Sequence, residues 1–354
     1  MFNDANYRPQ SPNSVPFYSN IAYNLLGRAL ESVHPNESYA AIIKKLIFDP
    51  ACMKTAGFDT PKNASEAILP GKGEQWFAEP FENYDPSGGI WVTPKEFHTF
   101  AQALRSNKLL SAVETRKWLQ PRASLPSLYQ LVGAPWEIIR PIDLDIKFPR
   151  PIDIYTKSGS VTGYASYLIL IPEYDITITM TAGGNSATSA LSKLISTVIR
   201  PLVAHADRKA RNQALARYGG TYRPTTTVNS NSSLTLTLDG GPGLKISSFT
   251  MNGANVIAGL AAMQKKPVGN ASARLYPYDT DAWVDGKQVW RLQLDGPLPT
   301  IDSWAELDCA SWLSGDVVRY VGSALDMLEV KVDKKGKAEE IYLSGWQSSL
   351  KKVN

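Results

Sequence analysis

From Tyr218 onward the sequence reads entirely as short strands and turns, and this pattern restricts the last part of the chain to an all-β fold. Residues 234–238 alternate leucine with threonine, and Asp239-Gly240-Gly241 stops this run. Residues 289–294 and 328–332 follow as strands, and residues 333–336 form a hairpin turn. We therefore expect a C-terminal β-rich domain of barrel or lipocalin type over residues 213–354.

The residues before this domain mix the periodicity of helices with that of strands. Thr93 is a typical helix N-cap, with Pro94 at the first helical position and Glu96 completing a capping-box pattern. Helices are expected over residues 19–32, 38–48, 93–105, 111–119 and 187–216, the last broken near Pro201, and strands over residues 152–157, 163–172 and 175–182. The first domain would then span residues 1–212.

The composition indicates a folded protein, because 43% of the 354 residues are hydrophobic and 20% are charged. The net charge of +4 is spread along the chain, and its densest basic run, Lys331, Lys334, Lys335 and Lys337, alternates with acids. A solvated hairpin explains this run better than a nucleic-acid surface does. No stretch approaches the roughly 18 apolar residues of a membrane helix. We expect neither a nucleic acid nor a membrane as partner.

Signals for the cellular compartment conflict with one another. The sequence opens without a basic and apolar secretion signal, yet four glycosylation motifs favour a secreted ancestry, at Asn36, Asn63, Asn231 and Asn270. The localisation therefore stays open for the sequence as written, and a secreted protein is expected if the true N-terminus lies upstream of Met1. Cys52 and Cys309 leave one disulfide open as an alternative. Neither they nor the three histidines have the spacing of metal ligands, so no metal or cofactor is expected.

Two short motifs carry residues that are able to do chemistry. Tyr18-Ser19-Asn20 lies at a loop-to-helix junction, where a helix N-terminus stabilises negative charge and a nearby lysine would help a phenol act as a base. Lys157-Ser158-Gly159-Ser160 leaves a strand, where a glycine lets a ligand approach and the next N–H can serve as an oxyanion donor. Each motif alone is also explained without chemistry: a packed tyrosine followed by Ser19 or Asn20 as a helix N-cap, or a surface turn.

Taken in order, the motifs and the segments around them resemble a known family. The series runs from Tyr18–Gly27 through Phe48–Thr55, Pro86–Ile90 and Gly133–Arg140 to Tyr155–Gly159. It is similar to the class C serine β-lactamase and penicillin-binding-protein-like family, in its fungal branch with a C-terminal β-rich domain. The resemblance covers residues 1–215 and is looser beyond. It implies an α/β fold of helices around an antiparallel sheet.

The resemblance also implies an activity and a role for each motif residue. Family members attack an amide or ester carbonyl with a serine in a Ser-x-x-Lys motif and form an acyl-enzyme. By resemblance, Tyr18 and Lys157 are catalytic residues that assist proton transfer. Asn20 would contact the substrate amide, and Ser160 would supply one oxyanion N–H. Ser158 and Gly159 would line the substrate site, with serine at 158 where threonine is common.

The nucleophilic serine is missing at its expected place. Only 17 residues precede Tyr18, and none is lysine. Ser348-Ser349-Leu350-Lys351 fits the spacing, as does the overlapping stretch from Ser349 to Lys352, but both lie in the C-terminal domain and are interpreted as chance matches. We expect the first domain to be N-terminally incomplete, without two strands and a central helix. An uncovered sheet edge and an exposed apolar face would follow.

Three interpretations of the function remain open. The protein is a serine hydrolase or acyltransferase for small-molecule amides or esters, inactive without its nucleophile. Alternatively it is a pseudoenzyme or binding protein that keeps the cleft, linked to secondary metabolism, or a nonfunctional fragment. Trp76, Trp91 and Trp136 would line the cleft or fill the core, and Glu137 would pair with Arg140 or act as an acid. The sequence sets no oligomeric state.

Overall fold

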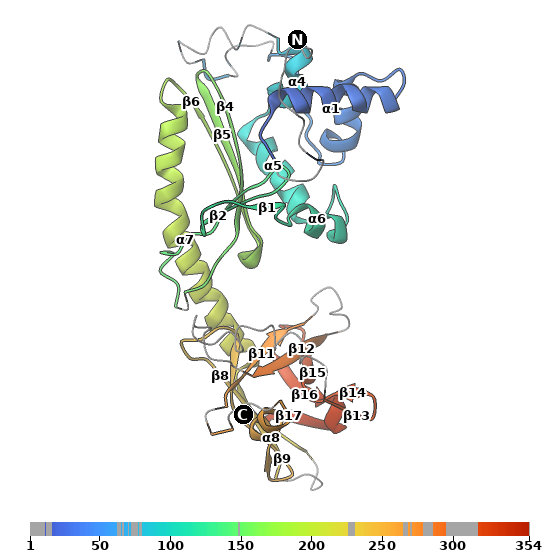
Figure 1. Cartoon of the computed structure of the whole chain (residues 1–354), viewed down its shortest axis with the longest axis vertical. Helices are drawn as coiled ribbons and strands as arrows, with labels where there is room; N and C mark the ends of the chain where they lie inside the picture. Colours follow the sequence, from blue (N-terminus) through green and yellow to red (C-terminus); the bar gives the residue numbers. More distant parts are fainter. Residues whose placement is uncertain are drawn as a thin grey trace. The chain divides into compact units, whose positions relative to one another are not determined.

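The computed structural model describes residues 11, 16–61, 65, 67–69, 71, 77, 80–147, 149–225, 231–264, 268–269, 271–278, 286–294 and 318–353. The chain divides into two compact units, one of residues 1–145 and 149–204 and one of residues 146–148 and 205–354 (Figure 1). Helix α7 begins in the first unit and ends in the second. In the described part, no helix combines the length and the apolar character that crossing a membrane requires.

The first unit holds helices around an antiparallel sheet. Side-chain caps start several of its helices: Ser19, Ser38, Thr93 and Ser111 each accept a hydrogen bond from the backbone N–H three residues on. Its elements are α1 (Asn20–Val33), α2 (Tyr39–Ile43), a π-turn η1 (Lys44–Phe48), η3 (Glu82–Tyr84), α4 (Asp85–Gly88), α5 (Pro94–Arg105), α6 (Ala112–Trp118), β1 (Ala123–Ser124), β2 (Gln130–Val132), β3 (Glu137–Ile139), β4 (Ile154–Val161), β5 (Tyr164–Ile171), η4 (Pro172–Tyr174), β6 (Ile176–Gly183) and α7 (Ala187–Tyr218).

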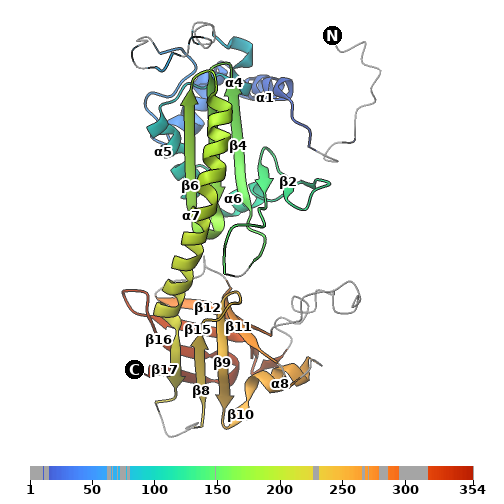
Figure 2. The same ribbon diagram turned by 90° about the vertical axis from the view of Figure 1, so that its left-hand side faces the viewer.

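The sheet of this unit runs in the order β1-β2-β3-β4-β5-β6, and every pairing is antiparallel. Helix α5 packs on one face, where Ala101 and Leu104 contact Leu168 and Leu170. The start of α7 packs on the other face, where Leu191 contacts Ala165 (Figure 2). Both faces of β5 are thus covered, which explains why its sequence is apolar almost throughout.

The helix α7 differs from its expected form. It is continuous from Ala187 to Tyr218, and Pro201 lies inside it, so the break expected near Pro201 is wrong. Proline removes one helical hydrogen bond and more often bends a helix than ends it. Here Ile199 and Val203, on either side of the proline, are both buried, so packing holds the helix on both sides of the missing bond.

The second unit is a closed antiparallel barrel. Its nine-stranded sheet runs in the order β10-β9-β11-β12-β15-β16-β17-β7-β8, and β8 also pairs with β9, which closes the ring. Apolar side chains fill the interior, among them Tyr222, Phe249 and Leu328, each no more than 2% exposed. Its strands are β7 (Gly220–Arg223), β8 (Ser233–Thr237), β9 (Leu244–Met251), β10 (Ala254–Asn255), β11 (Ala273–Pro277), β12 (Lys287–Leu294), β13 (Arg319–Tyr320), β14 (Ser323–Ala324), β15 (Met327–Val332), β16 (Ala338–Leu343) and β17 (Ser348–Val353), with η6 (Ser344–Trp346) before the last.

One element of this unit contradicts the expectation of strands and turns alone. Helix α8 (Val256–Met263) follows β10, and the Asn255 side chain caps it by accepting a hydrogen bond from Ala258 N–H at 3.1 Å. The run is apolar on almost every side, so it lacks the helical periodicity that would have revealed it. Its Asn cap and its three alanines were the available signals.

Candidate active site

Lys157 and Ser158 lie on β4 and share one carboxylate partner on the neighbouring strand. The register of β3 and β4 sets Glu137 opposite Thr156, one residue before Lys157 and two before Ser158. Lys157 Nζ donates to Glu137 Oε1 at 2.9 Å, and Ser158 Oγ donates to the same oxygen at 3.0 Å. The Glu137 carboxylate therefore holds the Lys157 ammonium and the Ser158 hydroxyl close together.

This pairing corrects the expectation that Glu137 pairs with Arg140. Arg140 instead binds Asp153, its Nη2 donating to Asp153 Oδ2 at 3.2 Å. Alternate residues of a strand face opposite sides of the sheet, so Glu137 and Arg140, three positions apart, reach different neighbours. The hydrogen bond to Asp153 raises the pKa of Arg140 above its ordinary value.

Tyr18 lies beside this cluster. Lys157 Nζ is 5.3 Å from the centre of the Tyr18 ring, within the range of a cation–π contact. Tyr18 precedes α1 and is 74% exposed. Ser19, not Asn20, caps the helix, with its Oγ accepting from Ala22 N–H at 3.1 Å. Asn20 is the first helical residue and is exposed, on the same short segment as Tyr18.

The position of α1, and with it that of Tyr18, depends on a glycine. Gly27 is the buried residue of α1, and a Cβ atom there would come within 2.3 Å of the Pro86 ring on α4. Any side chain at this position would push the two helices apart. Gly27 therefore lets α1 lie close against α4. This packing fixes where α1 begins and where the loop that carries Tyr18 ends.

The second half of β4 has a free edge within the described part of the chain. Strand β3 pairs with β4 only as far as Thr156, so residues 157–161 pair with β5 alone. Gly159 lies opposite Ser166, and a Cβ at 159 would be 2.7 Å from Ser166 Oγ. Ser160 Oγ is hydrogen-bonded to Thr188 Oγ1 on α7 at 2.9 Å. A free strand edge of this kind offers backbone N–H and C=O groups to a ligand.

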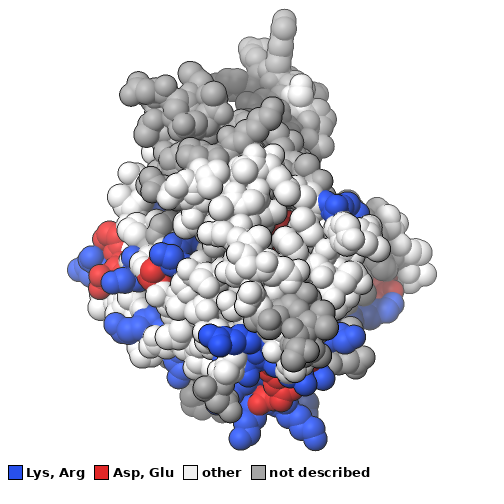
Figure 3. Space-filling model, turned by 90° about the horizontal axis from the view of Figure 1, so that it is seen from below, with Lys and Arg blue, Asp and Glu red and all other residues white. Residues whose placement is uncertain are grey.

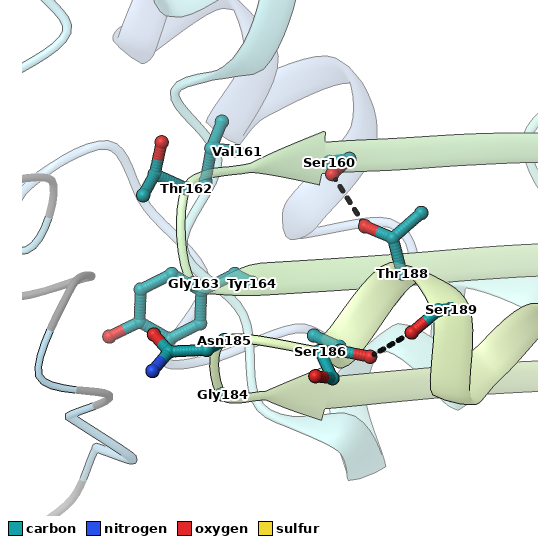
Figure 4. A pocket seen from close by; sticks show the side chains of 11 residues that line it. Ser160, Val161, Thr162, Gly163, Tyr164, Gly184, Asn185, Ser186, Thr188 and Ser189 are labelled. Atoms are coloured by element: carbon teal, nitrogen blue, oxygen red, sulfur yellow. Dashed lines mark hydrogen bonds between the residues drawn. The ribbon is translucent and has the colours of Figure 1, made fainter.

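A cavity of about 650 Å³ adjoins Ser160. The β4–β5 hairpin lines it from one side and the turn from β6 into α7 lines it from the other (Figure 4). Hydroxyl and amide side chains dominate the lining, and none of the described lining residues is Lys, Arg, Asp, Glu or His. Tyr164 lies at its wall, donates to the Ile68 carbonyl at 2.6 Å, and has its pKa raised by burial.

The tryptophans divide between site and core. Trp91 contacts the Tyr164 ring, with ring centres 5.8 Å apart, and so lies next to the wall of the cavity. Trp136 is 2% exposed and packs against Tyr155 and Trp118 in the core. Trp76 lies outside the described residues. No grouping of three or more His, Cys, Asp or Glu side chains suited to a metal ion occurs among the residues the structure describes.

The remaining residues singled out in the sequence lie away from this cluster. Asn36 and Asn231 are exposed in turns, and glycosylation at either stays a prediction. Asn63 and Asn270 lie outside the described residues, as does Cys309, so the alternative of a disulfide to Cys52 stays open. Cys52 is exposed, and its Sγ is 3.3 Å from Lys108 Nζ.

Comparison with known proteins decides the family. The family model described as "Beta-lactamase" matches residues 5–195, more than half of the chain. This chain belongs to the β-lactamase family. A second model, described as "Beta-lactamase-like-like, C-terminal domain", matches residues 210–354.

Relatives of this β-lactamase family member come from fungi. A "Beta-lactamase-like protein" of Arthroderma benhamiae is 27% identical over 92% of this chain and 58% of its own length. A "Probable hydrolase clz13" of Cochliobolus lunatus is 26% identical over 97% of this chain and 56% of its own. The chain thus spans just over half the length of both. A solved class C β-lactamase from Rhodobacter sphaeroides is 21% identical over 56% of this chain and 64% of its own, with a TM-score of 0.43.

Sequence reasoning missed two partners of the site residues. Glu137 and Thr188 hold Lys157 and Ser160 through hydrogen bonds between side chains. Both contacts cross between elements, and only the strand register or the packing of α7 sets them. Pairing the segment of Glu137 with the strand of Lys157 as antiparallel neighbours would have found the first. No local signal marks the second.

Proposed function

We propose that this protein is a serine hydrolase or acyltransferase that acts on a small-molecule amide or ester through an acyl-enzyme. One observation carries the proposal: Lys157 Nζ lies 5.3 Å from the Tyr18 ring although the two residues are far apart in the sequence. A phenol beside a fixed ammonium is a suitable proton acceptor at an acyl-transfer site. Membership of the β-lactamase family and the relative named a probable hydrolase agree with it.

Acylation by this route needs one proton to move twice. The serine oxygen bonds to the substrate carbonyl carbon while Tyr18 takes the serine proton. The bond to the leaving amine or alcohol then breaks, and the proton passes to that group. In the second half of the cycle, water or another acceptor attacks the acyl group. Hydrolysis and acyl transfer share all earlier steps, so the acceptor alone separates them.

The other residues bind and orient the substrate in this proposal. The Glu137 carboxylate keeps the Lys157 ammonium close to Tyr18. The free edge of β4 lets the substrate lie beside Gly159, where the Ser160 N–H is a donor to the developing oxyanion. Asn20 and Ser158 contribute an amide and a hydroxyl near the scissile bond.

The nucleophile is proposed to come from a segment outside these 354 residues. Residues 348–351 have the Ser-x-x-Lys spacing but are not proposed as the nucleophile motif. They lie on β17, where Ser348 faces the barrel interior and Lys351 faces solvent. A serine and a lysine three residues apart come together on a helix, not on a strand.

Two surfaces of the first unit fit the docking of such a segment. On α1, Ile21, Leu25 and Leu26 are between 56% and 61% exposed, and together they form an apolar stripe. Strand β6 pairs with β5 alone among the described strands, so its other edge is open. The relatives have room for the segment, because the alignments cover only 58% and 56% of their lengths.

The decisive test compares the chain with a version extended by the in-frame transcript sequence upstream of Met1. Both are incubated with a p-nitrophenyl ester and a chromogenic β-lactam and measured by intact-protein mass spectrometry. We expect a stoichiometric acyl adduct on the extended protein and none on the 354 residues alone. Tyr18→Phe or Lys157→Gln in the extended protein should lower the acylation rate by about 10²-fold or more at unchanged melting temperature. An adduct on the 354 residues, or unchanged rates, would refute the assignment.

A second candidate function is binding without catalysis. The observation that favours it is the cavity of about 650 Å³ beside Ser160, which is formed without any nucleophile. A binding protein would hold the same amides or esters intact. Isothermal titration with non-hydrolysable analogues tests this, with Thr188→Trp to fill the cavity. Unchanged affinity in that variant would exclude this cavity as the binding site.

A further inference from the structure

A line of charged side chains crosses five neighbouring strands of the barrel. Lys287 on β12 lies opposite Lys331 on β15, and Lys331 lies opposite Glu340 on β16. Glu340 in turn lies opposite Lys351 on β17, which lies opposite Arg223 on β7. Strands are spaced about 4.8 Å apart, so the line is about 19 Å long. We call its four cations, Arg223, Lys351, Lys331 and Lys287, the cation row.

The cation row points away from the barrel interior. The residues just before Arg223, Lys351 and Lys331 are Tyr222, Leu350 and Val330, each no more than 1% exposed. Because strand residues alternate between faces, the three cations lie on the outer face. All four cations are exposed.

The cation row is not neutralised by ion pairs. None of its four members forms an ion pair or a side-chain hydrogen bond with another residue in the described ranges. Other cations of the barrel do: Arg274 binds Asp239 at 2.9 Å, and Arg291 binds Asp326 at 2.8 Å. Glu340 is the one carboxylate in the line, so the row keeps an excess of positive charge.

The hairpin between β15 and β16 adds lysines at one end of the row. Lys334, Lys335 and Lys337 are exposed there. The one acid of the described turn, Asp333, accepts hydrogen bonds at its Oδ1 from Lys335 N–H at 2.7 Å and from Lys337 N–H at 2.8 Å. Burial lowers the pKa of Lys352, and the nearby Lys337 lowers it further. Figure 3 shows Lys and Arg gathered around a small group of Asp and Glu at one border of the end seen from below.

The arrangement indicates which kind of polyanion fits. The cations form a single line, and a single line of charge suits a linear polyanion better than a flat membrane surface. The neighbouring line of outward-facing residues holds no cation; it consists of Val289, Glu329, Tyr342 and Ser349. Three of the four cations are lysines, which act as point charges without the planar fork that holds a carboxylate or phosphate bidentately, so the row recognises a spacing of negative charges. No aromatic residue stands in the row to stack on a base. The hydroxyls of Tyr342 and Ser349 run alongside and are suited to sugar hydroxyls.

We propose that this face of the barrel binds an acidic polysaccharide that carries a carboxylate on successive sugar rings. The binding is electrostatic and independent of the acyl-transfer site. It would hold the protein against a polymeric matrix while the first unit acts on its substrate.

The first experiment measures binding of polygalacturonate to the whole chain by isothermal titration calorimetry. Fully methyl-esterified polygalacturonate serves as the matched ligand, with the same backbone and no charge. We expect binding of the acid form alone, weakening steadily as NaCl rises from 20 to about 500 mM, because salt screens exposed charges. Equal binding of both polymers, or no binding of the acid form at low salt, overturns the proposal.

The second experiment assigns the binding to the cation row. Lys331→Gln/Lys351→Gln removes two of its charges, and Lys95→Gln/Lys193→Gln removes two exposed charges from the first unit. The row variant should lose about tenfold in affinity and show a shallower salt dependence, while the control keeps its affinity. Both variants change outward side chains and should keep the wild-type circular dichroism. An equal loss of affinity for polygalacturonate in the row variant and the control variant overturns the proposal. Tighter binding of the wild-type chain to single-stranded DNA or to phosphatidylserine vesicles than to polygalacturonate also overturns it.

Discussion

The two sheets of this protein bury their apolar surface in different ways. In the barrel, each strand of the ring has a neighbour on both sides, and one continuous cluster of buried residues fills the interior. In the first unit, an open sheet carries several separate clusters between its strands and helices. There β6 has a partner on one side only among the strands that the structure describes, and α1 exposes Leu25 and Leu26.

This difference shows which unit has paired its strand edges and buried its apolar surface, and which unit still exposes some of both. Closing a sheet gives each strand of the ring a hydrogen-bonded neighbour on both sides, so the described barrel has no edge strand within its ring. An open sheet with an exposed apolar helix stripe still has surface to bury. We therefore expect the barrel to be sensitive to changes inside it, and the stripe on α1 to tolerate changes until another element covers it.

The largest effect is expected from a cavity in the barrel core. Leu328 is fully buried on β15, and Leu328→Ala should cost about 2–5 kcal/mol of unfolding free energy. Hydrogen exchange measured by mass spectrometry would assign the loss of protection to residues 218–353. Unchanged protection there would mean that the interior is not packed as described.

A smaller effect is expected from the ion pair that joins β11 to the loop after β8. The side-chain hydrogen bonds from Arg274 hold the pKa of Asp239 well below its ordinary value, and the N–H of Gly241 adds to this. Arg274 is 9% exposed, so Asp239→Asn should cost about 1–3 kcal/mol at pH 7. A carboxyl with a lowered pKa stabilises the fold above its unfolded pKa of about 3.9 and loses that contribution as the pH falls.

Melting temperatures of Asp239→Asn and the wild-type protein, taken between pH 7 and pH 2, measure this effect. Their difference should be largest near neutral pH and shrink below about pH 4. A difference that grows toward low pH would contradict the assigned sign.

In the first unit, hydrogen bonds also lower the pKa of a carboxylate, that of Glu96 at the start of α5. Burial acts to raise its pKa, but the hydrogen bonds from the Thr55 hydroxyl and from the backbone N–H groups of Thr55 and Lys54 outweigh it, so the pKa is lowered. Glu96→Gln should cost about 0.5–1.5 kcal/mol at neutral pH, with the same direction of pH dependence. Chemical denaturation monitored at the tryptophans of this unit measures it, and a cost above that of Asp239→Asn would reverse the ranking.

The smallest effect is expected on α1. Leu25 and Leu26 are 56% and 61% exposed, so Leu25→Ser/Leu26→Ser should change stability by no more than about 0.5 kcal/mol per site. Thermal unfolding of the 354-residue chain tests this. In a version extended upstream, the same pair should cost clearly more, because the proposed segment covers the stripe. Equal costs in both versions would remove that support for the segment.

Much of the local structure was predictable because it depends on neighbouring residues. Thr93 caps α5 as expected, but the second half of the capping box is absent, since the Glu96 carboxylate bonds to Thr55 and Lys54 instead. The expected strands correspond to β4, β5 and β6 within a few residues. Helix α8 and the uninterrupted α7 were missed, because burial on all sides hides periodicity and packing outweighs one proline.

The sequence by itself determined the two-part organisation of the chain, the family resemblance and the pair of motifs around Tyr18 and Lys157. It did so because periodicity, capping residues and motif spacing are properties of short stretches. The tertiary structure alone decided that Glu137 holds Lys157 and that four cations from four different strands stand in one line. Both depend on strand register, which sets residues far apart in the chain opposite one another and which no single short stretch of sequence specifies.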